Sequence, residues 1–232
     1  RHIDTASYYE NEEAIGRALA KSDVSREELF ITSKCWEDEQ GYDEVLEAFN
    51  RSLEKLQTDY LDLYLIHWPN PKSIETWKAM EKLYEEGKVR AIGLSNFHSK
   101  HIEVIFEEAS VWPMINQYER HPYLTQDKLY QVCREKGMRV EAWSPIARGA
   151  VLHEKTIVDL ADKYKKTPGQ IVLRWQIQTG YIVFPKTSSS ERLAENINVF
   201  DFSLTKQEIE AINALNKDHR YGKDPESLDV IE

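Results

Sequence analysis

The run Asp62-Leu63-Tyr64-Leu65-Ile66-His67 is a continuously apolar, β-rich stretch that ends in an ionisable residue. A run without polar alternation is typical of a parallel strand buried on both faces. Two similar runs precede it, one at 1–6 that carries Asp4 and one at 29–34 that ends at Lys34. The ionisable residues are 30 positions apart (4 to 34) and 33 apart (34 to 67), about one strand-helix-strand unit each. The three runs therefore predict a parallel α/β fold.

Further strand-like runs follow along the chain, at 89–95, 113–118, 138–144 and 181–186. Helical periodicity fills the intervals, as in the amphipathic segments near 42–57 and 73–86. Capping boxes, in which a Ser or Thr precedes a Glu or Gln by three positions, mark three helix starts, at Thr167, Ser188 and Thr205.

Seven strands that alternate with helices favour a (β/α)8 TIM barrel over an open sheet. We expect residues 1–232 to form a single domain. Seven is one strand short of closure, and the chain opens inside a strand-like run without an initiator Met. We therefore expect strand 1 and helix 1 to lie upstream of Arg1. The tail from Asp218 to Glu232 lacks periodicity and is expected to be irregular.

The composition limits the classes of function. A formal net charge of −10 argues against general nucleic-acid or anionic-membrane binding. Cys35 and Cys133 form no disulfide framework, and no apolar run approaches about 18 residues, so we expect a cytoplasmic protein without a membrane span. We also expect a monomer. His98 and His101 lack the further ligands that a metal site needs, so no metal is expected.

Four side chains near the ends of the first three strands suggest acid–base chemistry. The carboxyl ends of barrel strands meet on one face, so Asp4, Tyr9, Lys34 and His67 are expected to converge. A phenol normally titrates near ~10, and an adjacent ammonium lowers that pKa. Lys34 is expected to act on Tyr9 in this way, with Asp4 holding Lys34. His67 is placed to orient a substrate carbonyl, so the set is suited to protonating a carbonyl oxygen.

A structural interpretation of the same residues stays open. Asp4 then caps a helix, Lys34 lies at a barrel rim and His67 is a hydrogen-bonded core histidine. Trp36 and Trp68 follow two of the strand ends. They either line a substrate pocket or belong to an ordinary aromatic rim.

The segment 185–192 (PKTSSSER) follows the last strand and resembles an anion site. Ser188 and Glu191 are expected to cap a helix whose free N–H groups, together with Lys186 and Arg192, would bind phosphate. A phosphate site after the last strand of a barrel is common. A well-capped polar loop is the alternative.

Polar and aromatic residues end three other strands. Ser95, Asn96 and Gln117 offer donors and acceptors that suit a carboxamide, and Trp143, followed by Ser144, offers a flat face for a planar ring. The alternative is that these residues are ordinary turn residues and core aromatics. The sequence contains no G-x-G-x-x-G fingerprint, so no Rossmann dinucleotide site is expected.

Taken together, these motifs resemble the aldo-keto reductases over essentially the whole chain. The resemblance rests on segments that occur in family order: 2–6 (HIDTA), 8–12 (YYENE), 31–34 (ITSK), 65–69 (LIHWP), 93–97 (GLSNF), 115–117 (INQ) and 185–187 (PKT). The chain looks most similar to bacterial members such as diketogluconate and methylglyoxal reductases. The family's opening hairpin and first strand are not found in it, and Trp143 and Thr187 stand where Tyr and Ser are commoner.

The resemblance implies an enzyme that uses NADP(H). It implies Tyr9 as the proton donor, with Asp4, Lys34 and His67 completing a tetrad. It also implies that Ser95, Asn96 and Gln117 hold the nicotinamide carboxamide. The remaining cofactor contacts that it implies are to the nicotinamide ring, the 2′-phosphate and the adenine, from Trp143, Ser144, Lys186, Thr187, Ser188, Arg192, Glu195 and Asn196.

The expected function is therefore NADPH-dependent reduction of small aldehydes, ketones, dicarbonyls or keto sugars to alcohols. Two alternatives stay open. The barrel either binds NADPH with little turnover, in a sensing or structural role, or is an inactive truncated form.

Overall fold

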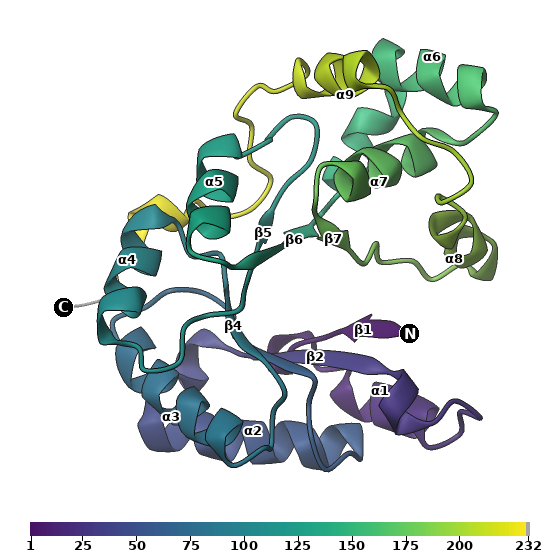
Figure 1. Cartoon of the computed structure of the whole chain (residues 1–232). Helices are drawn as coiled ribbons and strands as arrows, with labels where there is room; N and C mark the ends of the chain where they lie inside the picture. Colours follow the sequence, from purple (N-terminus) through teal and green to yellow (C-terminus); the bar gives the residue numbers. More distant parts are fainter. Residues whose placement is uncertain (231–232) are drawn as a thin grey trace. The chain divides into compact units, whose positions relative to one another are not determined.

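Residues 1–230 are described by the computed structural model, which has an α/β fold with strands in chain order (Figure 1). The strands overlap the predicted runs, and β2 and β5 each end one residue beyond them: β1 (His2–Asp4), β2 (Phe30–Cys35), β3 (Leu63–Ile66), β4 (Ile92–Ser95), β5 (Ile115–Glu119), β6 (Arg139–Trp143) and β7 (Ile182–Val183). The pairs β1/β2, β2/β3, β3/β4 and β6/β7 are parallel. The predicted parallel α/β class is confirmed.

The helices fall between the strands, as the periodicity predicted. They are α1 (Glu12–Leu19), α2 (Tyr42–Leu56), α3 (Ser73–Glu85), α4 (Ser99–Glu108), α5 (Asp127–Glu135), α6 (Lys155–Tyr164), α7 (Pro168–Gln178), α8 (Ser190–Ile197) and α9 (Lys206–Asn213). Five short 3₁₀ segments also occur within the described residues: η1 (Ser7–Tyr9), η2 (Arg26–Glu28), η3 (Glu37–Glu39), η4 (Ala147–His153) and η5 (Pro225–Ser227).

The chain divides into two compact units. The first comprises residues 1–116 and the tail from Asp224, and the second comprises residues 117–223. The single domain over 1–232, the eighth strand and closure into a barrel stay predictions.

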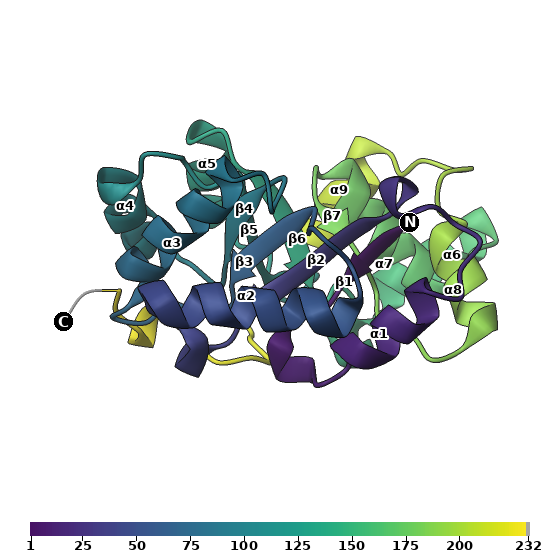
Figure 2. The same cartoon turned by 90° about the horizontal axis from the view of Figure 1, so that it is seen from below.

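In the first unit, α2 and α3 cover one face of the strands β2, β3 and β4 (Figure 1, Figure 2). The apolar face of α2 supplies Val45 and Phe49, both fully buried. The Phe49 ring meets Tyr64 of β3 edge to face, with 5.0 Å between ring centroids. This packing fixes the strands from one side, so their carboxyl ends have a defined position.

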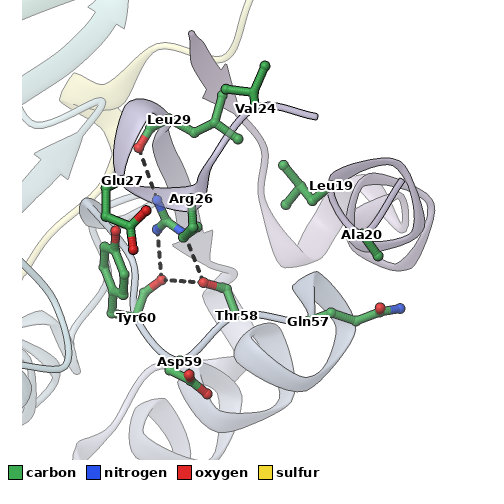
Figure 3. A pocket seen from close by; sticks show the side chains of 10 residues that line it. All are labelled: Leu19, Ala20, Val24, Arg26, Glu27, Leu29, Gln57, Thr58, Asp59 and Tyr60. Carbon is green, nitrogen blue, oxygen red and sulfur yellow. Dashed lines mark hydrogen bonds between the residues drawn. The ribbon is translucent and has the colours of Figure 1, made fainter. Parts of the chain in front are cut away.

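The opposite edge of the first unit, where the strands begin, is held by Arg26 (Figure 3). Its guanidinium donates to Thr58 and to the carbonyls of Leu29 and Tyr60, and forms a 2.8 Å ion pair with Asp62. A cavity of about 290 Å³ lies beside it. Since Leu29 and Asp62 precede β2 and β3, this cavity is remote from the strand ends that carry the candidate site.

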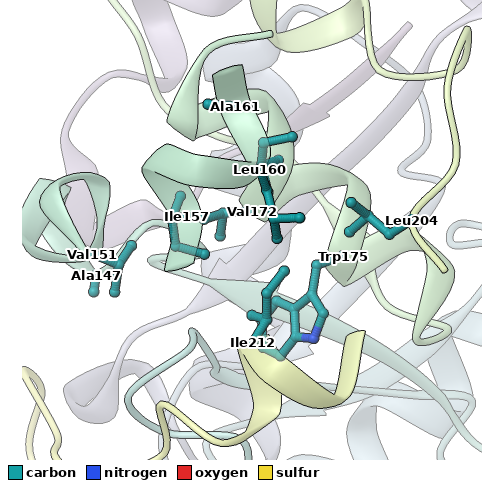
Figure 4. Packing of buried hydrophobic residues seen from close by; sticks show 10 residues of the cluster. Ala147, Val151, Ile157, Leu160, Ala161, Val172, Trp175, Leu204 and Ile212 are labelled. Carbon is teal, nitrogen blue, oxygen red and sulfur yellow. The ribbon is translucent and has the colours of Figure 1, made fainter. Parts of the chain in front are cut away.

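In the second unit, a cluster around Trp175, Val172 and Ile212 packs α6, α7 and α9 together (Figure 4). The capping boxes at Thr167 and Thr205 are confirmed as the starts of α7 and α9.

The third predicted capping box is wrong. The N-cap of α8 is Ser189, whose hydroxyl accepts from the backbone N–H of Arg192 at 3.2 Å. Ser188 therefore lies one position before the cap, and the carboxylate of Glu191 accepts from the Ser189 hydroxyl.

The tail from Asp218 is irregular apart from η5, as predicted; its last residues, Ile231 and Glu232, lie outside the described part. His98 and His101 contact this tail, His98 Nδ1 at 2.6 Å from Glu226 and His101 Nε2 at 2.8 Å from the carbonyl of Leu228. Across residues 1–230, no helix is long and apolar enough to cross a membrane.

Candidate active site

Three of the four predicted catalytic residues lie at the carboxyl ends of neighbouring strands. Asp4 ends β1, Lys34 is the second-last residue of β2 and His67 directly follows β3. Tyr9 ends the one-turn helix η1, which follows β1 after two residues. The parallel pairing of β1 with β2 and of β2 with β3 is what brings these strand ends to the same edge.

Lys34 forms the centre of the site. Its side chain is fully buried, and Nζ lies 2.5 Å from Oδ1 of Asp4 and 2.9 Å from the carbonyl oxygen of Thr5. A buried ammonium needs such partners, because leaving it unpaired is costly. Asp4 and the Thr5 carbonyl therefore hold the Lys34 ammonium in a fixed position.

Tyr9 lies over this charge. Lys34 Nζ is 5.2 Å from the centroid of the Tyr9 ring, and Tyr9 meets His67 edge to face at 5.6 Å. The residue as a whole is 45% exposed, but desolvation of its phenol group is the largest influence and raises the pKa above 10. The charge and hydrogen bond of Lys34 act in the lowering direction.

The expectation that Lys34 brings the Tyr9 pKa below its ordinary value is therefore wrong for this structure. Burial, together with the charge of Asp4, outweighs the ammonium. The phenol consequently keeps its proton at neutral pH, which is the form that an acid requires.

His67 is a neutral base in this environment. It is only 6% exposed, and burial together with the charge of Lys34 lowers its pKa to about 3. Within the described residues, its Nδ1 atom has no hydrogen-bond partner. A buried ring nitrogen without a partner is unusual in a core, where polar atoms are normally satisfied. The hydrogen-bonded core histidine of the structural interpretation is therefore not what the Nδ1 atom shows.

An aromatic wall, made of Tyr8 and Trp36, borders the tetrad. The two rings stack at 3.8 Å with 20° between their planes, and Trp36 lies 4.9 Å from the His67 ring. Trp68 is half-buried, and its carbonyl accepts from Gln40 at 2.7 Å. Sequence reasoning selected Trp36 and Trp68 but missed Tyr8, whose only signal was its position next to Tyr9.

Ser95 and Asn96 lie at the end of β4, in the same unit as the tetrad. Both are buried, and Asn96 adopts a left-handed backbone conformation with φ 64°. Its amide nitrogen donates to the carbonyl of His67 at 2.9 Å and lies 3.1 Å from the Ser95 hydroxyl. Asn96 thus joins the strand end of β4 to that of β3.

The other expected cofactor residues belong to the second unit. Gln117 is buried on β5 and donates to Glu141 at 2.9 Å. Trp143 ends β6 and is partly exposed, and Ser144 after it has φ 49°. A side chain at Gly222 would place Cβ 2.5 Å from the Trp143 indole, so only glycine allows the backbone to pack on that ring.

The segment before α8 is exposed and cationic. In the part of the chain that the structure describes, neither Lys186 nor Arg192 forms an ion pair, and Ser188 is exposed beside them. The hydroxyl of Thr187 accepts from the backbone N–H of Ser189 at 3.1 Å, which shapes the turn into the helix.

Two expected adenine contacts lie further along α8. Glu195 accepts from the hydroxyl of Thr167, so its carboxylate already has a protein partner, and Asn196 is half-buried.

Known proteins match this chain over nearly its whole length. Residues 1–217 match the model of the aldo/keto reductase family. The chain is 49% identical over 229 residues to the glyoxal reductase of Bacillus subtilis, covering 98% of this chain and 83% of that protein. It is 46% identical over 233 residues to the methylglyoxal reductase DkgA of Escherichia coli, covering 98% and 84%.

Solved structures give the same result. An aldo-keto reductase from a Medee basin deep-sea metagenome library superposes with a TM-score of 0.96 at 41% identity, covering 99% of this chain and 86% of that one. A Bombyx mori aldo-keto reductase, in complex with NADP, superposes with a TM-score of 0.89 at 41% identity, covering 95% and 80%.

Proposed function

Because the chain belongs to the aldo/keto reductase family, we propose that it is an NADPH-dependent oxidoreductase that reduces small carbonyl compounds to alcohols. The substrates that we propose are aldehydes and ketones, including dicarbonyls and keto sugars. Similarity to a glyoxal reductase and a methylglyoxal reductase supports the dicarbonyls in particular.

The observation that carries the proposal is the buried Lys34, held by Asp4 at 2.5 Å and lying beneath the Tyr9 ring. A protonated phenol beside a fixed ammonium is suited to giving up its proton, because the ammonium stabilises the phenolate that is left behind. In our proposal Tyr9 donates this proton to the carbonyl oxygen of the substrate.

His67 has a separate part. With a pKa of about 3 it stays neutral at physiological pH, so one ring nitrogen carries a proton and the other does not. We propose that the ring N–H donates to the same carbonyl oxygen and orients it toward Tyr9. Asp4 holds Lys34 in place and does not itself meet the substrate.

NADPH, when bound, supplies the hydride that goes to the carbonyl carbon. The residues present fit such a group: Lys186 and Arg192 are cations without an ion-pair partner among residues 1–230, at the N-terminal end of α8, and Trp143 is a partly exposed aromatic residue. NADP and NADPH complexes among the similar structures support this choice of cofactor. The proposed contacts are Ser95, Asn96, Gln117, Trp143, Ser144, Lys186, Thr187, Ser188, Arg192, Glu195 and Asn196.

Two of these side chains are already oriented by the protein. The amide nitrogens of Asn96 and Gln117 donate to His67 and Glu141, which fixes the direction of each carboxamide plane. Preorganised groups bind a ligand at a lower entropy cost. Trp36, Trp68 and the newly identified Tyr8 would line the substrate side.

The remaining features of the proposal are a cytoplasmic monomer with the closed (β/α)8 barrel typical of this architecture, and no nucleic-acid or membrane partner. The net charge of −10 supports the last point.

The direct test is consumption of NADPH, followed by its absorbance, with methylglyoxal and with 4-nitrobenzaldehyde as substrates. Turnover that depends on both protein and carbonyl is expected. Tight NADPH binding without turnover on either substrate would instead support the sensing or structural alternative.

A further inference from the structure

We propose that Glu39 is a positioning residue, whose carboxylate holds the helix η1 and its Tyr9 phenol in the geometry needed for proton donation. The proposal rests on the function proposed above. It adds a residue on a different loop, 30 positions from Tyr9 in the sequence, to the machinery of the reaction.

One oxygen of Glu39 joins two segments of the site. Its Oε2 atom accepts from the Ser7 hydroxyl at 2.5 Å and from the backbone N–H of Trp36 at 2.9 Å. Ser7 is the first residue of η1, and Trp36 directly follows β2. Hydrogen bonds to a carboxylate are about twice as strong as neutral ones. This single atom therefore links the loop of the acid to the strand end of Lys34.

The backbone of η1 has few other restraints, whereas its Tyr8 and Tyr9 rings contact Trp36, Lys34 and His67. It is a single turn with no buried residue and no side-chain cap, and its backbone bonds, from Tyr9 to Ala6 and from Glu10 to Ser7, are internal to the turn. The Ser7 hydroxyl also lies 3.1 Å from the carbonyl oxygen of Lys34. Because Tyr9 is two residues from Ser7, a displacement of Ser7 moves the phenol relative to Lys34.

The second restraint on η1 also depends on Glu39. Tyr8 stacks on Trp36 at 3.8 Å, and the backbone of Trp36 is bound by the same carboxylate oxygen. Loss of the Glu39 carboxylate would thus release the backbone of Trp36 and the hydroxyl of Ser7, the neighbour of Tyr8. The aromatic wall and the acid would shift together.

The other carboxylate oxygen has an ordinary surface partner. Oε1 lies 3.2 Å from Arg51, whose side chain is 49% exposed. Pairs of this kind contribute little. Arg51 also forms an ion pair with Glu47 at 3.9 Å, and the Glu47 side chain is 77% exposed. Glu47 is therefore a matched control for Glu39.

The test compares kcat for methylglyoxal in the wild type, Ser7→Ala, Glu39→Ala and Glu39→Gln. Misplacement by about 1 Å costs up to ~100-fold in rate, so we expect Ser7→Ala and Glu39→Ala to lower kcat by ~10-fold or more. The dissociation constant of NADPH should stay within about twofold. Glu39→Gln keeps an acceptor oxygen and should recover part of the loss, whereas Glu47→Ala should match the wild type.

A double-mutant cycle separates positioning from general damage. If Glu39 acts through Tyr9, then Ser7→Ala should lower kcat by less than about twofold when it is combined with Tyr9→Phe. Circular dichroism and urea unfolding establish that each variant is folded. Should Glu39→Ala fail to fold, Glu39→Gln and Ser7→Ala decide together, because Ser7→Ala also removes the contact to the Lys34 carbonyl.

Two results would overturn the proposal. The first is a kcat within about twofold of wild type in Ser7→Ala, and the second is an equal loss from Ser7→Ala with and without Tyr9→Phe. Failure of the proposed function has a different signature, since the wild type would then not turn over methylglyoxal, or Tyr9→Phe itself would keep the wild-type turnover. If Tyr9→Phe lowers kcat while Ser7→Ala keeps the wild-type kcat, the positioning role of Glu39 is overturned and the proposed function is not.

Discussion

Lys34 Nζ lies 2.5 Å from Oδ1 of Asp4, and this ion pair joins two neighbouring parallel strands, β1 and β2, at their carboxyl ends. The lysine side chain is fully buried and that of Asp4 is 7% exposed. A pair so placed is not a surface salt bridge. Its main effect is that neither charge is left alone in a low-dielectric environment.

Asp4→Ala is therefore expected to destabilise the fold strongly. The change leaves the buried Lys34 ammonium beside the Thr5 carbonyl but without its carboxylate, and breaking a buried pair costs about 3–5 kcal/mol. Urea unfolding at neutral pH measures the loss. As a control, Asp159→Ala removes the carboxylate of an exposed helical pair with Lys155 and should change the unfolding free energy little. Equal effects of the two substitutions would contradict this account.

Tyr9→Phe tests the acid. Removing the hydroxyl deletes the proton that the substrate oxygen receives, so turnover should fall by at least ~10²-fold, the usual scale for losing a general acid. The affinity for NADPH should barely change, because the ring that packs beside His67 remains. Steady-state and single-turnover kinetics provide the measurement. A near-normal kcat at saturating substrate, with chemistry rate-limiting, would show that another group donates the proton.

The strand ends and the convergence of Asp4, Lys34 and His67 were predictable because parallel strands must present their carboxyl ends at one edge. The pKa direction of Tyr9 was not, since it depends on how much of the phenol is desolvated, and no local pattern encodes that. Likewise, the contact between Ser7 and Glu39 spans 32 positions and leaves no periodic trace in the sequence.

The helix start at Ser189 illustrates a different limit. Three consecutive serines each carry a hydroxyl able to cap, and the S-x-x-E spacing selected Ser188. The backbone instead turns so that Ser189 accepts from Arg192. Side-chain chemistry alone does not distinguish adjacent identical residues, because the choice is made by the φ and ψ angles of the preceding loop.

Lys186→Ala tests the choice of cofactor. NADPH differs from NADH by the 2′-phosphate, and loss of a charge-assisted contact to it costs ~1.5–3 kcal/mol, or about tenfold or more in affinity. Fluorescence titration should show NADPH binding weakened far more than NADH binding. Lys206→Ala, an exposed lysine at the start of α9, serves as the control for general charge loss. If the substitution weakens the binding of NADPH and NADH equally, Lys186 does not recognise the 2′-phosphate.

His67 gives the protein a specific loss of stability in mild acid. Its pKa is about 3 in the folded state against 6.5 ordinarily, so between these values the unfolded state binds the extra proton. The free energy of unfolding therefore falls as the pH drops below 6.5, by up to about 1.4 kcal/mol per pH unit from this group, and is fully regained above it.

His67→Gln removes this titration. Urea unfolding at pH 7.5 and pH 5 should show the variant losing about 2 kcal/mol less than the wild type over this interval. His2 and His101, whose pKa values are also lowered, are present in both proteins and cancel in the comparison. Equal losses in the two proteins would mean that the His67 ring already takes up its proton in the folded state.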